Sequence, residues 1–257
     1  MKTSFALNEY LNSLNNHTTV VNYEIALKEF LKRTPTTEKI SVKKVEKYKF
    51  SLREKSPQTR ASRMSAIRGF CDYCWTQGWL DSAPSLCVKN DPTEKYAKAK
   101  NVTLEEYGTL LKAISTDAIK GLRDLLLLRL IYIIGDVNKV LLYTWGTKVP
   151  ANLEIIKKYF AKSLLDNIDM KELKRGYVFF SLDSFDTSTH LSRSAVRKLL
   201  KKYTESAGFE ENYFDFQALK RLRAKQIYEE TGSVDAVNQF CGHKSMKATR
   251  ALIKTFS

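Results

Sequence analysis

The stretch SPQTRASRMSAIRGFCDYCWTQGWL, residues 56–80, decides the fold of the first part of the chain. Ser56 is a good N-cap and Pro57 suits the first turn, so a helix is predicted to begin here. Apolar residues recur along one side of it, at Met64, Ile67, Phe70, Cys71, Cys74 and Trp75. The opposite side carries Arg60 and Arg63. The stretch therefore predicts an amphipathic helix with one buried and one basic face.

Further helices are predicted on the N-terminal side of this stretch. Regularly spaced leucines indicate a helix around residues 7–14. A second helix follows an N-cap at Thr18 or Thr19 and stops before Pro35, because proline disfavours helical backbone in the residue before it. A third helix is predicted over residues 41–52.

The character of the chain changes after these four helices. Residues 1–86 are predicted to form a small helical domain, and the polar, lysine-rich residues 87–101 a linker. Residues 102–257 form a second domain, which opens on a capping box made by Thr103 and Glu106. Helices are predicted there over 103–114, 118–134, 151–165, 192–206, 217–231, 233–241 and 245–254, and short strands over 141–145 and 177–180. The predicted fold class is mainly α, with two domains and a reduced β-sheet.

The charge of the chain points to its partner. The 257 residues carry a formal charge of +15, from 43 Lys and Arg against 28 Asp and Glu. The excess is shared, with 18 against 10 in residues 1–100 and 25 against 18 in residues 101–257. A basic surface on each domain predicts a polyanionic partner, although a merely solvated surface gives the same count. Ten glycines and five prolines are too few for a turn-rich all-β fold or a glycine-rich phosphate loop.

Other classes of protein and site are disfavoured. The most apolar run, residues 122–134, is too short and too charged to span a bilayer, and no signal peptide is expected, so we predict a cytoplasmic protein. Four cysteines in a chain of this size do not suggest a disulfide framework. Cys71 and Cys74 form a C-x-x-C, for which core-facing thiols are the favoured interpretation and a zinc or redox site the alternative. We expect no metal and no cofactor.

The helix predicted over residues 192–206 is the strongest candidate in the second domain for contact with the polyanionic partner. Ser192 is a natural N-cap, Arg193 and Arg197 follow one turn apart, and Lys198 lies behind them. Arginine can bind guanine through two hydrogen bonds, whereas lysine mostly contacts phosphate. A solvated basic helix face is the alternative interpretation.

Several segments, taken in order, resemble the tyrosine recombinase, or phage integrase, family. Residues 56–80 are similar to the family helix S-x-x-T…R-x-x-S-A-[IL]-R-x-F, and residues 81–84 to the segment that closes its first domain. Matching segments of the second domain are Val102–Glu106, Leu125–Gly135, Tyr177–Phe180, Leu191–Arg197 and Phe240–Ser245, the last similar to L-G-H-x-S. The resemblance implies a two-domain clamp that grips duplex DNA.

The chain departs from the family pattern at the positions that carry its chemistry. The family cleaves DNA with a tyrosine nucleophile, assisted by two arginines, a lysine and histidines. The matching positions hold Val137 for the first arginine, Gln217 and Lys220 for the pair in H-x-x-R, and Leu252 for the tyrosine, while His243 is retained. A leucine cannot attack phosphorus, and an ammonium cannot form the forked contact of a guanidinium. We therefore predict that the chain is not an enzyme and has no catalytic residues.

Without cleavage, the remaining expected function of both domains is contact with DNA. The resemblance implies contacts from Thr59, Arg60, Arg63 and Arg68 on the first-domain helix. At the remnant of the active site, phosphate contacts are predicted from Lys220, Arg223, His243 and Lys244. For His243, a hydrogen-bonded turn histidine is an equally good interpretation.

These observations predict a sequence-specific double-stranded DNA-binding protein with a recombinase fold that has lost strand cleavage. The leading hypothesis is a transcriptional regulator or repressor of a phage or mobile element. An accessory or architectural factor for site-specific recombination is one alternative, and a residual recombinase with relocated chemistry is another. We expect no membrane association, a place at the nucleoid, and a monomer or weak dimer that pairs on DNA.

Overall fold

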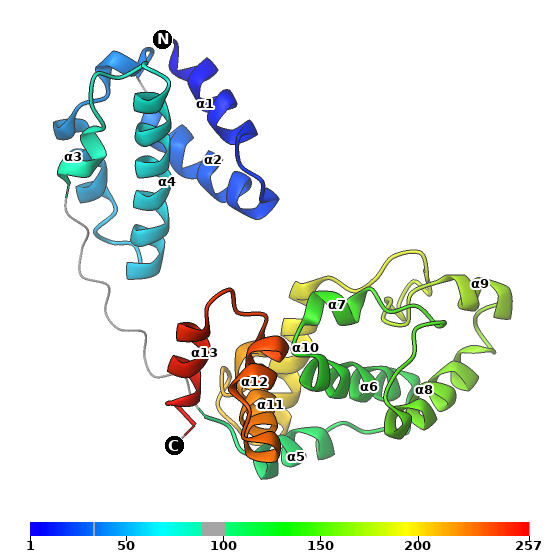
Figure 1. Ribbon diagram of the computed structural model, residues 1–257. Coiled ribbons are helices and arrows are strands. Elements are labelled where there is room, and N and C mark those ends of the chain that lie inside the picture. Colours follow the sequence, from blue (N-terminus) through cyan, green and yellow to red (C-terminus); the bar gives the residue numbers. More distant parts are fainter. Residues whose placement is uncertain (33, 89–100, 257) are drawn as a thin grey trace. The chain divides into compact units, whose positions relative to one another are not determined.

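The computed structural model describes residues 1–32, 34–88 and 101–256 (Figure 1). The chain divides into two compact units, Met1–Lys98 and Ala99–Ser257. The predicted linker, residues 87–101, lies mostly outside the described residues.

The first unit is a helical bundle. Its helices are α1 (Thr3–Asn12), α2 (His17–Leu31), α3 (Val42–Ser51) and α4 (Pro57–Thr76), with short 3₁₀ turns η1 (Thr37–Lys39) and η2 (Pro84–Cys87). Ser56 caps α4 and Pro57 occupies its first turn, as predicted. The cap of α2 is Asn16 rather than Thr18 or Thr19, because the Asn16 side chain accepts the Thr19 N–H at 3.1 Å.

The buried face of α4 forms the centre of the core of the first unit. Ile67, Phe70, Cys71 and Cys74 are completely buried, and α2 packs across them. The two cysteines are free, and burial raises the pKa of Cys71 to about 11 and that of Cys74 to about 12. The complete burial of both thiols confirms the prediction that they face the core. Trp75, predicted on the same stripe, is 49% exposed.

The second unit is built around one buried helix. Its elements are α5 (Leu104–Lys112), α6 (Ile119–Ile134), α7 (Val137–Leu141), α8 (Ala151–Leu164), α9 (Met170–Arg175), α10 (Arg193–Ser206), α11 (Phe216–Thr231), α12 (Val234–Cys241) and α13 (Met246–Ile253). α6 packs against both α8 and α11, and Figure 1 shows these helices around it. The capping box of Thr103 and Glu106 is present. Among the described residues, no helix has the length and apolar character that crossing a membrane requires.

The predicted strands are shorter than expected. Leu141 ends helix α7, and an isolated antiparallel bridge joins Thr144 to Tyr177. The chain then turns, with the Thr147 N–H donating to the Thr144 carbonyl at 3.0 Å, and enters α8 six residues after Trp145 at Ala151. The mainly helical class is confirmed, and the reduced sheet is a single bridge in the described part of this unit.

The end of α6 depends on Gly135, which has a positive φ of 69° and stops the helix. A Cβ at this position would lie 2.6 Å from the Phe240 ring. We expect Gly135→Ala to destabilise the chain by more than the ~1 kcal/mol of left-handed strain alone. Gly108→Ala is the matched control, because Gly108 lies within α5 with open space around it and should gain roughly 0.5–1 kcal/mol. Urea denaturation of both variants measures whether their changes in the free energy of unfolding have opposite signs. Equal changes would contradict the structural role given to Gly135.

Candidate nucleic-acid interface

Helix α10 presents a basic edge to solvent. The Ser192 hydroxyl accepts the Ala195 N–H at 3.1 Å and fixes the start of the helix. Val196 is fully buried against the core of the unit, whereas Arg193, Arg197 and Lys198 are exposed. The burial of one side of the helix thus determines which side chains remain available to a ligand.

A cavity of about 500 Å³ runs between α10 and the segment that leads into α11. The Arg193 guanidinium lies over the Phe216 ring, 5.3 Å from its centroid, which holds the flat group in place. Lys201 and Glu211, which also line the cavity, form an ion pair at 2.7 Å. The cavity is lined by Arg193, Arg197, Lys198, Leu200, Lys201, Glu211, Asn212, Phe214, Asp215, Phe216 and Gln217.

A second group of polar residues gathers where α11 meets the end of α12. The Lys220 ammonium donates to the Cys241 carbonyl at 2.8 Å. Gly242 follows with a positive φ of 67°, and this turn places His243 and the exposed Lys244 directly after α12. The fold therefore brings Lys220 and His243, 23 positions apart in sequence, to one end of α12.

Arg223 forms its ion pair and hydrogen bond within α11 rather than with this group. Its guanidinium forms an ion pair with Glu230 at 3.2 Å and donates to Gln226 at 3.3 Å, both on α11 itself. The four side chains predicted to contact phosphate are thus divided between the α12 end and the side of α11.

The remaining positions of the family's chemistry have three different surroundings. Val137 is 3% exposed and belongs to the core of the unit. Gln217 is exposed and lines the cavity beside α10. Leu252 packs on α13 against a small apolar cluster that contains Ala224, Val237 and Cys241. Each substituted residue fits its local environment as a packing or surface residue.

The basic residues of α4 in the first unit are bonded within that unit. Arg63 forms an ion pair with Glu29 and lies 3.5 Å from the Tyr48 hydroxyl. Arg68 donates to the Val88 carbonyl at 2.8 Å. Arg60 donates to the Arg53 and Lys55 carbonyls at 3.2 Å each, and Thr59 shares a hydrogen bond of 2.8 Å with Ser56. Three of these four residues help to hold the bundle together, which helical spacing alone did not reveal.

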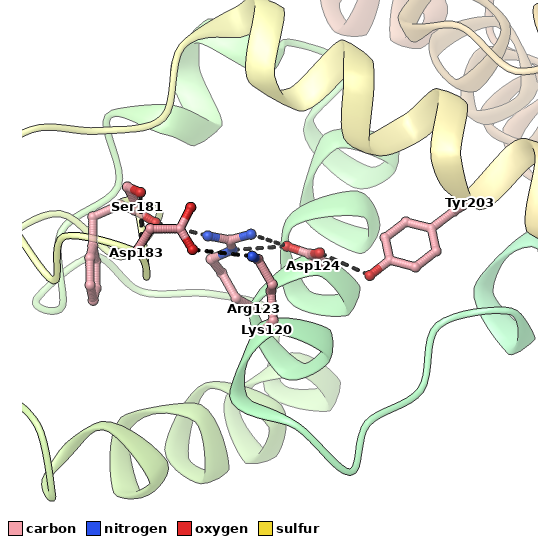
Figure 2. Close-up of polar contacts among 7 residues, drawn as sticks. Lys120, Arg123, Asp124, Ser181, Asp183 and Tyr203 are labelled. Atoms are coloured by element: carbon pink, nitrogen blue, oxygen red, sulfur yellow. Dashed lines mark hydrogen bonds and ion pairs between the residues drawn. The ribbon is translucent and has the colours of Figure 1, made fainter.

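The sequence also did not predict a buried polar network beneath α10 (Figure 2). Arg123 and Asp124 on α6 are only 4% and 3% exposed and pair at 2.7 Å. Arg123 also donates to the Phe180 carbonyl at 3.0 Å, and the Tyr203 hydroxyl of α10 donates to Asp124 at 2.9 Å. Burial and the Asp124 carboxylate raise the pKa of Tyr203, so its hydroxyl stays protonated as a donor. The network joins α6, α10 and the segment around Phe180, and thereby anchors the helix that carries the basic edge.

Lys157 is a further residue that periodicity did not single out. It is 6% exposed on α8, and its ammonium donates to the carbonyls of Trp145 and Thr147 at 2.9 and 2.6 Å. It therefore holds the tight turn between Thr144 and Thr147. Its position inside an otherwise apolar face of the helix, with Leu153 and Phe160 also buried, is the sequence signal that could have found it.

The sequence and the fold both match one group of proteins. The model of the Phage integrase family matches residues 147–254. The tyrosine recombinase XerC of Thermodesulfovibrio yellowstonii is 22% identical over 218 residues, which cover 77% of this chain and 72% of that protein. A lambda integrase tetramer bound to a Holliday junction matches 100% of this chain and 78% of its own, with 14% identity and a TM-score of 0.73. The XerH recombinase bound to a palindromic difH substrate, in a post-cleavage complex, matches 92% and 76%, with 14% identity and a TM-score of 0.69.

The helical architecture is the fold of these solved recombinase structures. The predicted resemblance to the tyrosine recombinase, or phage integrase, family is confirmed, because that family's model matches residues 147–254 and the sequence is similar to that of a XerC recombinase. The prediction that it is not an enzyme is wrong, because the tyrosine recombinases to which its sequence is similar are enzymes. The prediction weighed the residues at four positions, Val137, Gln217, Lys220 and Leu252, and these replacements do not demonstrate that cleavage is lost.

Proposed function

We propose that the chain binds a specific duplex DNA sequence, with α10 as its reading element. The observation that carries this proposal is the exposed basic edge of α10, where Arg193, Arg197 and Lys198 line one cavity. The solved neighbours support it, since a lambda integrase tetramer was solved on a Holliday junction and XerH on its difH substrate.

The three basic residues of α10 have different chemical roles in this proposal. Arg193 is held over Phe216, so it loses little conformational freedom when it meets a base. Arg193 and Arg197 are assigned to base edges, because a guanidinium matches guanine with two hydrogen bonds. Lys198 is assigned to backbone phosphate, as a point charge that carries no sequence information.

Further backbone contacts are assigned to the end of α12 and to the first unit. Lys220, His243 and Lys244 lie at or beside one turn, and we assign them, with Arg223 on the neighbouring helix, to phosphates. In the first unit, Thr59 and Arg63 line a shallow cavity of about 360 Å³ on α4, and we assign that helix to the same duplex.

The phosphate assignments predict a change in salt dependence. We expect Lys198→Ala with Lys244→Ala to weaken binding to all duplexes alike and to lower the slope of log K against log salt by about 2. Fluorescence anisotropy over a salt series measures this slope. Lys158→Ala with Lys162→Ala removes two exposed lysines of α8 and serves as the control. An equal change in the control pair would contradict the assignment, and no binding to any duplex at low salt would remove the proposed function.

We further propose that the bound protein controls transcription near its DNA site and acts as a repressor. The recombinase relatives favour a second role at the same kind of site, in recombination itself. Chromatin pull-down with sequencing separates the two roles. Bound promoters support regulation, whereas a single attachment-like site supports recombination. Trapping of a covalent protein–DNA adduct on a nicked duplex would give a direct readout of strand cleavage.

A further inference from the structure

The outer face of helix α8 carries two large apolar side chains. Ile155 and Tyr159 are 59% and 60% exposed, and they lie one helical turn apart. Side chains four positions apart are neighbours on the surface of a helix, so these two form one continuous patch. A single exposed apolar residue is ordinary on a protein surface, whereas neighbouring ones on one face indicate a docking surface.

The buried face of α8 determines where this patch points. Leu153, Phe160 and Leu164 are completely buried, and α8 packs against α6. Ile155 and Tyr159 lie on the opposite side of the helix, so they point away from α6. Figure 1 shows α6 between α8 and the helices α11 and α12. The patch is therefore separate from the basic residues at the end of α12.

Two exposed lysines border the patch. Lys158 and Lys162 lie one turn apart on the same outer face of α8, beside Ile155. Within the ranges that the structure describes, neither forms a hydrogen bond or an ion pair. By contrast, Lys201 and Lys225 each pair at 3.8 Å with a glutamate one turn further along their own helix. The apolar patch of α8 thus has two uncompensated positive charges at its edge.

This combination of side chains decides which kind of molecule fits. A second copy packed patch to patch would bring four lysines together, in a chain that already carries a formal charge of +15. A DNA backbone would neutralise the lysines but would leave the two apolar side chains without apolar contacts. A protein segment that carries both apolar and acidic residues satisfies the patch and its edge together.

We propose that the outer face of α8, made by Ile155, Lys158, Tyr159 and Lys162, docks an acidic amphipathic segment of another protein. Burial of Ile155 and Tyr159 supplies most of the affinity, because large side chains at the centre of an interface dominate its energy. The two lysines select the acidic partner and orient it. This docking surface does not require the proposed DNA binding, so it can be tested without DNA.

The first test uses a synthetic peptide and the full chain. The probe has the length of α8, 14 residues, with leucine at every third or fourth position and glutamate elsewhere, and a matched peptide has lysine in place of glutamate. Isothermal titration calorimetry should show binding of the glutamate peptide and at least tenfold weaker binding of the lysine peptide. Ile155→Ala with Tyr159→Ala should weaken the glutamate peptide at least tenfold. Ile25→Ala, which changes a 55% exposed isoleucine of α2, is the control and should have no effect.

A second variant tests the charges separately. Lys158→Glu with Lys162→Glu changes only exposed side chains, so the fold is kept, and circular dichroism checks this. We expect the variant to reverse the preference, so that the lysine peptide binds more tightly than the glutamate peptide. Unchanged preference would show that the lysines do not select the partner and would overturn the proposal.

The other outcomes also decide the matter. No binding of the glutamate peptide to the unmodified chain, or equal binding to the chain and to Ile155→Ala with Tyr159→Ala, overturns the docking surface. A dimer in analytical ultracentrifugation that Tyr159→Glu disperses would make a second copy the occupant instead. Displacement of the peptide by duplex DNA, together with weaker duplex binding in Lys158→Ala with Lys162→Ala, would assign the face to DNA and overturn the proposal.

Discussion

Replacement of Arg193 and Arg197 together by alanine is expected to weaken binding of the preferred duplex at least thirtyfold. Each residue is assigned a two-pronged contact with a base, and such a contact contributes about 1–3 kcal/mol of discrimination, so two contribute at least about 2 kcal/mol. Binding to unrelated duplexes should fall much less. Competition binding with the selected sequence and with a scrambled one measures the ratio of affinities directly.

The control for the Arg193 and Arg197 double variant removes the same number of positive charges from a different helix. Lys158→Ala with Lys162→Ala also removes two positive charges from an exposed helix face, on α8 rather than α10. If both double variants lose affinity equally, with specificity unchanged, α10 acts through charge alone and does not read sequence. Thermal melting checks that loss of the Arg193 contact with Phe216 leaves the unit folded.

Arg123→Ala is expected to destabilise the second unit by about 3–5 kcal/mol. Asp124 is almost completely buried, and without its partner it would be a charge in an apolar interior. Urea denaturation followed by circular dichroism measures the shift. Lys120→Ala is the matched control, one turn away on α6, because its pair with Asp183 at 3.3 Å is exposed and should contribute no more than about 1 kcal/mol.

Removing both members of the buried pair gives a further comparison. Arg123→Met with Asp124→Leu leaves no isolated charge, so it should be less destabilising than Arg123→Ala alone. Tyr203→Phe, which removes one donor to Asp124, should cost about 1–3 kcal/mol. If Arg123→Ala were no worse than Lys120→Ala, the network of Figure 2 would not be holding α6 to α10.

Local signals predicted most of the helices, because their caps and apolar stripes lie close together in sequence. Ser56 with Pro57, Thr103 with Glu106, and Ser192 all begin helices where expected. The misplaced cap of α2 shows the limit of this reasoning, since Asn16, Thr18 and Thr19 are all acceptable caps by type.

Features that depend on distant partners could not be predicted in this way. Arg63 looked like a ligand-facing residue until the fold placed Glu29 and Tyr48 against it. Arg123 and Asp124 were noticed only as charges that made the apolar run unsuitable for a membrane, whereas their partners, Phe180 and Tyr203, are far away in sequence. The positions around His243 were matched by motif, but its bond to Thr249 required the packing of α13.

The hydrogen bonds of Lys157 and Lys220 to carbonyl oxygens affect the electrostatic field around the second unit. A carbonyl is electrically neutral, so each of these hydrogen bonds fixes an ammonium without cancelling its charge. The entropy of ordering those long side chains is lost during folding, before any ligand arrives. These lysines therefore act as stationary cations, unlike the freely moving lysines of the exposed helix faces.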